Sequence, residues 1–232
     1  ANALDLFGTV KDIITKLAVN FPEGMKWNVG YDSTEFILAS MAEITETLVI
    51  TFLLVVLITY VFLQDWRATL VPAVAIPVSL IGTFLFLYMF GMSINTLSMF
   101  ALILVIGSVV DNAICVVESC MRLMQEERLT PFDAAVKTMQ QLSGALIAAT
   151  LVVVAVYLPI GFYGGMVGRI YKEFSVTMCV ALLISTVVAL TLSPAMCAKI
   201  LREPKEPKGF FKAFNRILDR TVNKYASVAG FL

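Results

Sequence analysis

Hydrophobic residues in this chain form five long runs, separated by short polar connections. A helix that crosses a bilayer needs about 20 mainly apolar residues, and each run is close to that length. No Lys or Arg falls near the middle of any run. The pattern predicts an all-α membrane protein with about five spanning helices, near residues 45–64, 68–90, 96–121, 142–162 and 174–196.

Polar residues and glycines predict where these helices begin and end. Asp32, followed three residues later by Glu35, is typical of a helix start, so the first helix should project beyond the membrane before entering it. Thr130 followed by Pro131 predicts another start, because Thr is a good N-cap and Pro suits the first helical position. The glycine-rich run at residues 161–165 should end the fourth span.

The first 32 residues are less hydrophobic than the five predicted spans. Apolar residues at helical spacing predict a helix over about residues 4–17, and weak alternation over residues 25–31 indicates a strand. A unit this short cannot hold its own core. Residues 1–32 are therefore expected to be the end of a larger α/β domain, and the whole chain a piece of a longer protein.

The end of the chain has a different pattern. Basic residues recur every four positions from Lys208 to Lys224, beside an apolar row that begins at Phe211. Residues 201–228 are therefore expected to form a basic amphipathic helix on the membrane surface, after a membrane bundle at 33–200. The alternative is a solvated helix packed on another domain. Residues 229–232 resemble the start of a further span.

Charge and composition indicate the orientation of the chain in the membrane and exclude several classes of function. Most of the 17 Lys and Arg residues flank one side of the predicted spans, so that side should be cytoplasmic and residues 1–32 should lie outside. The chain is 59% hydrophobic, against about 45–50% in soluble domains. It has no histidine, no CxxC pair and no net charge. We therefore expect no enzyme activity, no metal site, no cofactor and no nucleic-acid partner.

One predicted span carries a stripe of small and polar residues at three- and four-residue steps: Leu104, Gly107, Ser108, Asp111, Cys115 and Glu118. Residues with this spacing share one helix face. Apart from Leu104, they suit a neighbouring helix or a water-filled cavity better than lipid. A carboxylate near the midplane costs about 2.5–3.5 kcal/mol on insertion scales, which predicts a function for Asp111. The alternative is that Asp111 and Asn112 only fix helix packing.

The residues around this stripe resemble a known family. The run SINTLSMF at residues 93–100, followed by Gly107-x-x-x-Asp111-Asn112-Ala113-Ile114 and the Val-Val-Glu at 116–118, is similar to the fourth membrane helix of resistance–nodulation–division (RND) exporters. The nearest type is the AcrB-like multidrug efflux pump. Further similar stretches lie at residues 62–70, 141–146, 162–165 and 193–198.

The resemblance implies the second to sixth of twelve membrane helices, followed by a cytoplasmic surface helix, with residues 1–31 ending a periplasmic porter subdomain. It implies a trimeric, proton-driven antiporter of the bacterial inner membrane that exports amphiphilic drug-like compounds. Its partners would be a periplasmic adaptor and an outer-membrane channel.

The resemblance also implies a proton-binding site. In the family two adjacent aspartates bind the transported proton and face a lysine of the second half. Asp111 matches the first aspartate, and Asn112 stands at the second position. Asn112 cannot titrate, so one of the two proton-relay groups is absent. Because the predicted spans hold no central Lys or Arg, Asp111 is either protonated within them or paired with a cation elsewhere in the protein.

Two other functions stay open at this point. A sterol-sensing-type lipid-binding or regulatory membrane module shares a five-helix unit with this superfamily, and it would need no titrating carboxylate. Within the same superfamily, an exporter of metal ions or lipids is the other alternative.

Overall fold

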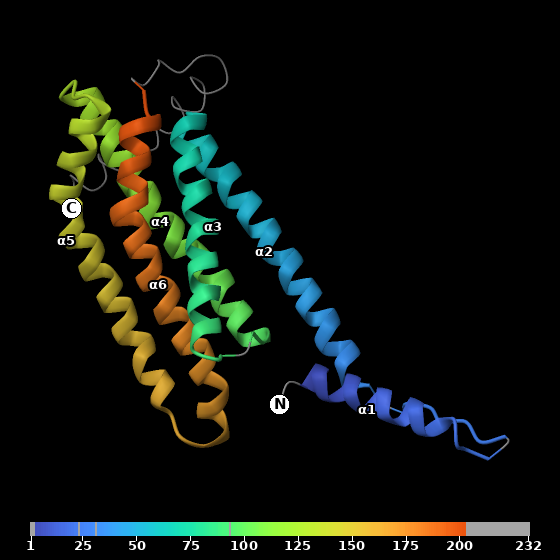
Figure 1. Cartoon of the computed structure of the whole chain (residues 1–232). Coiled ribbons are helices and arrows are strands. Elements are labelled where there is room, and N and C mark those ends of the chain that lie inside the picture. Colours follow the sequence, from blue (N-terminus) through green and yellow to red (C-terminus); the bar gives the residue numbers. More distant parts are fainter. Residues whose placement is uncertain (1–2, 23, 31, 93, 203–232) are drawn as a thin grey trace, which may run out of the picture.

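The computed structural model describes residues 3–22, 24–30, 32–92 and 94–202. Its elements, in chain order, are α1 (Ala3–Ala18), α2 (Ser33–Leu63), α3 (Trp66–Met89), α4 (Thr96–Glu126), α5 (Pro131–Tyr157), the 3₁₀ helix η1 (Leu158–Phe162) and α6 (Gly165–Ile200) (Figure 1). Five of these helices, α2 to α6, are long and apolar enough to cross a membrane. The predicted all-α membrane fold class is confirmed.

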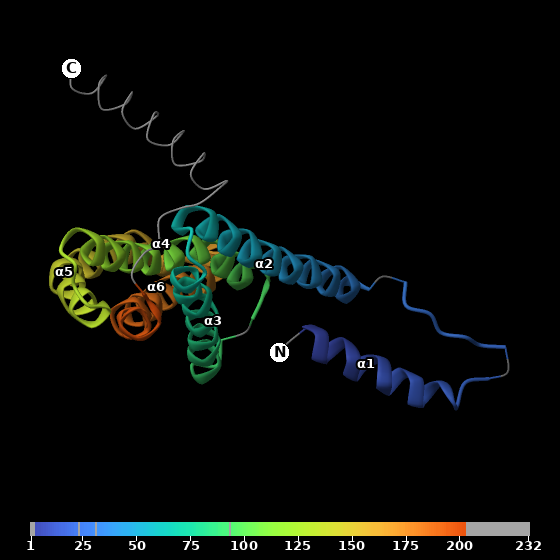
Figure 2. The same ribbon diagram turned by 90° about the horizontal axis from the view of Figure 1, so that it is seen from above.

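Helices α4 and α6 lie at the centre of the bundle. Helix α6 packs against α3, α4 and α5, and α4 also packs against α2, α3 and α5. In their most hydrophobic windows, 50% of α4 and 56% of α6 is buried, but only 6% of α2 and 11% of α5. Helices α2 and α5 therefore form opposite edges of the bundle, while α1 extends away from it (Figures 1 and 2).

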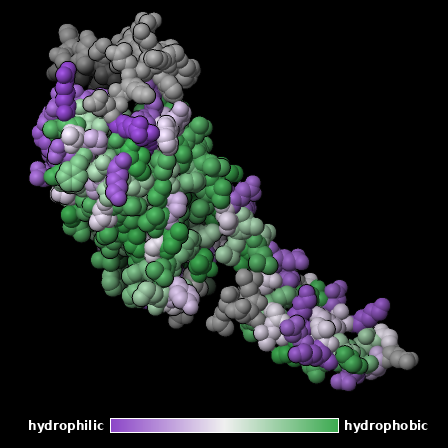
Figure 3. Space-filling view, turned by 45° about the horizontal axis from the view of Figure 1, so that its top comes forward, coloured by the Kyte–Doolittle hydropathy of each residue, from purple (hydrophilic) through white to green (hydrophobic). Residues whose placement is uncertain are grey.

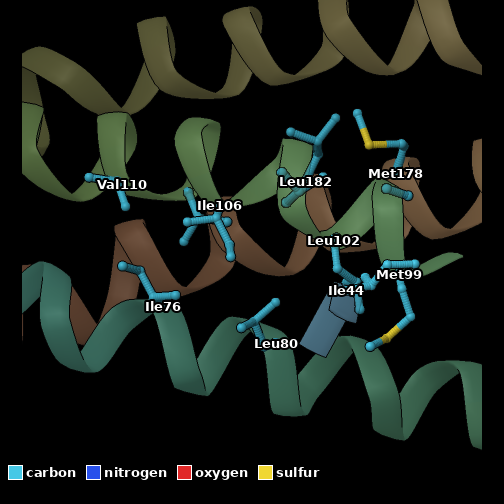
Figure 4. Close-up of a cluster of buried hydrophobic side chains, with 13 residues drawn as sticks. Ile44, Ile76, Leu80, Met99, Leu102, Ile106, Val110, Met178 and Leu182 are labelled. Atoms are coloured by element: carbon cyan, nitrogen blue, oxygen red, sulfur yellow. The ribbon is translucent and has the colours of Figure 1, made fainter. Parts of the chain in front are cut away.

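Apolar side chains fill the space between the central helices. Ile76 on α3, Leu102 and Ile106 on α4, and Leu182 on α6 are buried in one cluster (Figure 4). A second cluster lies nearer the other end of α4, around Val116 and Leu123. Because lipid is as apolar as these side chains, close packing and not escape from water holds the helices together. The outer surface over the bundle is also apolar (Figure 3).

Short polar contacts also join neighbouring helices. The hydroxyls of Thr150 on α5 and Thr186 on α6 are 2.6 Å apart and buried. The Asn95 side-chain amide, just before α4, donates to the Glu173 carboxylate on α6. Interhelical hydrogen bonds in membranes contribute about 0.6 kcal/mol each on average, so they fix the register of the helices more than their stability.

The predicted helix starts are confirmed. Asp32 is the N-cap of α2, and its Oδ1 accepts from the Thr34 backbone N–H at 2.8 Å. Thr130 caps α5: its hydroxyl accepts from the Asp133 N–H at 3.2 Å and donates to the Asp133 Oδ2 at 2.6 Å. A capping box between Asn95 and Ser98 starts α4.

The glycine-rich break between α5 and α6 is also present, after η1. Gly165 has a φ of +75°, a conformation that L side chains rarely adopt. A Cβ on Gly168 would lie 1.8 Å from the Tyr163 carbonyl oxygen, so only glycine fits there. This sharp turn lets α6 run back along α5.

Some predicted elements differ from the structure. The strand expected at residues 25–31 is wrong for its described part, residues 25–30, which have no regular secondary structure. A strand needs a paired partner, and the described residues offer none, so the predicted α/β unit is here a single helix. The surface helix predicted at 201–228 and the span start at 229–232 lie outside the described residues, apart from Leu201 and Arg202.

Candidate functional site on helix α4

Helix α4 has one face that is fully packed. Its buried residues recur at helical spacing and include Val105, Ile106, Val109, Val110, Ala113, Val116 and Val117. They contact α2, α3, α5 and α6, which surround this side of α4. This face holds the bundle together and leaves the opposite side of the helix for other contacts.

The opposite face of α4 carries the predicted stripe. Gly107, Asp111, Cys115 and Glu118 are all exposed, and Ser108 is half-buried. A Cβ added to Gly107 would meet no atom within 4 Å. The small and polar residues thus share one face, as their spacing predicted, and α2 to α6 leave that face open.

Asp111 and Asn112 are not equivalent in the structure. Asp111 lies within the open face, whereas Asn112 is half-buried at its edge. Successive helical residues point about 100° apart, since a turn holds 3.6 residues. Within the described residues, neither side chain makes a hydrogen bond or an ion pair. Their polar groups are thus available to a part of the protein outside α2 to α6.

The positions of the basic residues agree with a partner for Asp111 outside α2 to α6. The described basic residues of α2 to α6 lie toward the ends of these helices, as Arg67 at the start of α3 and Lys199 at the end of α6 do. Among the described residues no basic side chain forms an ion pair with Asp111, so a cation that pairs with it would come from outside this bundle. Among the described residues no group of three or more His, Cys, Asp or Glu could hold a metal ion.

Five helices long and apolar enough to span a membrane, with a carboxyl group on the face of α4 that they leave open, define a multi-pass α-helical membrane protein. The family described as the AcrB/AcrD/AcrF family matches residues 1–232. The chain therefore belongs to this family of RND exporters, whose members are inner-membrane transporters and not enzymes.

Individual relatives agree with this assignment. The chain is 46% identical over 235 residues to the multidrug export protein AcrF of Escherichia coli, covering 99% of the chain and 23% of the relative. It is 44% identical over 236 residues to the toluene efflux pump membrane transporter TtgB of Pseudomonas putida, covering 99% and 22%. It is 42% identical over 234 residues to the solvent-resistant pump membrane transporter SrpB of Pseudomonas putida, again covering 99% and 22%. The chain thus spans less than a quarter of the length of these relatives.

Proposed function

We propose that this chain is the proton-relay half of the transmembrane domain of a proton-driven exporter. The observation that supports this most is the position of Asp111, on the open face of a helix whose other side is packed. A carboxyl group at this depth is costly unless it is used. In this proposal, Asp111 binds a proton from the periplasmic side and releases it toward the cytoplasm.

The open face would be covered by the second half of the transporter. Small residues such as Gly107 and Ser108 would let a helix of that half approach closely. A cation on that helix would pair with ionised Asp111, and protonation of Asp111 would release it. Proton binding would then change how the two halves pack, and that change would drive transport.

Asn112 leaves this relay with one titrating group. Two adjacent carboxyl groups would disfavour each other's ionised form, since both cannot easily carry charge at once. With Asn112 in place of the second acid, that repulsion is absent. We propose that the protein folds and inserts normally but couples protons weakly or not at all.

The exported compounds are proposed to be drugs or other amphiphilic molecules. The similar proteins are named for multidrug export, toluene efflux and solvent resistance, which supports apolar or amphiphilic cargo over metal ions. Family membership supports an exporter over a sterol-sensing-type module. By the same resemblance, the complete protein would be a homotrimer that works with a periplasmic adaptor and an outer-membrane channel.

Replacing Asp111 in the complete transporter tests the proposal. Asp111→Asn keeps the size and polarity of the side chain but removes its titration. Drug export from cells, measured at matched protein level, should fall to background for this variant, while trimer formation is unchanged.

The matched control is Glu126→Gln, which removes an exposed carboxylate at the end of the same helix. This control should export as the parent protein does. If Asp111→Asn exports at the parent level, Asp111 only supports packing and the relay proposal fails. A parent that itself exports at background would call for the comparison to be made with Asn112→Asp present.

A further inference from the structure

A groove of about 610 Å³ lies between α5 and α6, and no residue of α4 lines it. Its walls include Phe132, Met139 and Ser143 on α5, and Leu190, Ala195 and Ala198 on α6. The α5 wall belongs to the start of that helix and the α6 wall to its end. The groove therefore opens at the end of the bundle that the charge distribution predicts to be cytoplasmic.

The size and lining of the groove suit a hydrocarbon chain. Leu190 and Ala198 on α6 are separated by about 12 Å along the helix axis, at 1.5 Å per residue, and most of this length lies within the predicted span at 174–196. One leaflet contributes about 15 Å of hydrocarbon. The walls are mainly apolar, and the alanines of α6 leave room between the helices. A volume of several hundred Å³ is typical of sites that enclose a small ligand.

Positive charge lies at the cytoplasmic end of this groove. Lys199 is exposed and follows Ala195 by four residues, so it lies one helical turn beyond the groove on the same face. Arg202, also exposed, follows the end of α6. Among the described residues, Lys199 makes no ion pair, whereas Lys137 on α5 is paired with Glu127. Lys199 is thus available to an anion at the mouth of the groove.

We propose that this groove binds one anionic phospholipid of the cytoplasmic leaflet. An acyl chain lies between α5 and α6, and the phosphate group lies near Lys199 and Arg202. A zwitterionic lipid with the same chains binds less well, because its own ammonium group offsets the attraction of these cations.

Native mass spectrometry of the complete transporter tests this proposal with two probes, phosphatidylglycerol and phosphatidylethanolamine of identical acyl chains. The parent protein should retain phosphatidylglycerol preferentially. Lys199→Ala should weaken that retention about fivefold, the effect expected for one basic residue near an anionic headgroup. Lys172→Ala, which removes an exposed lysine near the opposite end of α6, should change nothing.

A second pair of variants tests whether the apolar walls of the groove hold the acyl chain. Ala195→Trp fills the groove and should remove the bound lipid, whereas Val187→Trp, at an exposed position of α6 outside the groove, should not. Equal retention of both lipids, or no effect of Lys199→Ala and Ala195→Trp, overturns the proposal.

The reactivity of an introduced cysteine distinguishes a bound lipid from a protein helix that covers the groove. In a background without native cysteines, Ala195→Cys should react with a membrane-soluble maleimide in lipid-depleted protein, and added phosphatidylglycerol should slow that reaction. Val187→Cys serves as the lipid-facing control. If position 195 stays unreactive while position 187 reacts, another part of the protein fills the groove and the lipid proposal is wrong.

Discussion

The two faces of α4 differ in composition and in what surrounds them. The packed face is built from Val, Ile, Leu and Ala, and four neighbouring helices bury it. Apart from Leu104, the open face is built from Gly, Ser, Asp, Cys and Glu, and no helix among α2 to α6 covers it. Both faces belong to one helix of 31 residues. The comparison indicates that one side of α4 specifies how α2 to α6 pack together, whereas the other side is left open to further contacts.

The packed face should be the more sensitive to loss of volume. Ile106→Ala removes a fully buried side chain and should lower the free energy of unfolding by about 2 kcal/mol or more, because it leaves a cavity among α3, α4 and α6. Leu104→Ala, two residues away on the open side and 59% exposed, should cost far less. Thermal unfolding of the purified complete protein measures both. Equal losses would show that the two faces are equally packed in the complete transporter.

The open face should be the more sensitive to gain of volume. Gly107→Leu meets nothing within α2 to α6, so it should be tolerated if this face contacts lipid or water. If a second half covers the face, the added side chain should cost about 1–3 kcal/mol, as overpacking does, and export should fall with it. The measurements are thermal unfolding and drug export of the complete protein. A neutral result would mean that the face stays open, against the proposed function.

Asn112→Asp adds a second carboxyl group at the edge of the open face of α4. Asn112→Asp should restore or increase proton-coupled export, because the volumes match and only titration changes. Proton flux in proteoliposomes under an imposed pH gradient, with and without drug, measures the effect. Equal, drug-stimulated flux in both proteins would mean that one carboxyl group suffices.

The smallest effect is expected far from α4, at the start of α2. The hydrogen bond from the Thr34 side chain holds the pKa of the Asp32 carboxyl below its ordinary value of 3.8. The ionised form therefore stabilises the helix start above pH 3.8, and the contribution disappears as pH falls through the lowered pKa.

Amide hydrogen exchange of the first turn of α2 should show this loss of protection at low pH. Asp32→Asn keeps a capping oxygen without a titrating group, so its protection should not change over the same range. A first turn with the same pH dependence in both proteins would assign the effect to another group.

Much of the fold was predictable from the sequence because local features decide it. Apolar runs of membrane length predicted all five spans, and Asp32 and Thr130 predicted two helix starts. The stripe from Leu104 to Glu118 was predictable for the same reason, since helical periodicity alone puts those residues on one side.

Other features depended on partners that no local pattern reveals. The strand expected at residues 25–31 is absent from its described part, residues 25–30, because a strand requires pairing, which depends on distant residues. The hydrogen bond from Asn95 to Glu173 likewise follows from a contact between helices that lie far apart in the sequence.

For this protein, the sequence by itself determined that the chain is a membrane protein, where its helices cross and which residues share the polar face. These follow from length, hydropathy and the 3.6-residue period, which act within a single helix. Only the tertiary structure decided that α4 and α6 are central, that α2 to α6 leave the Asp111 face uncovered, and that α5 and α6 leave a groove between them. Those features depend on how side chains of separate helices fit together, and periodicity along one helix carries no information about that fit.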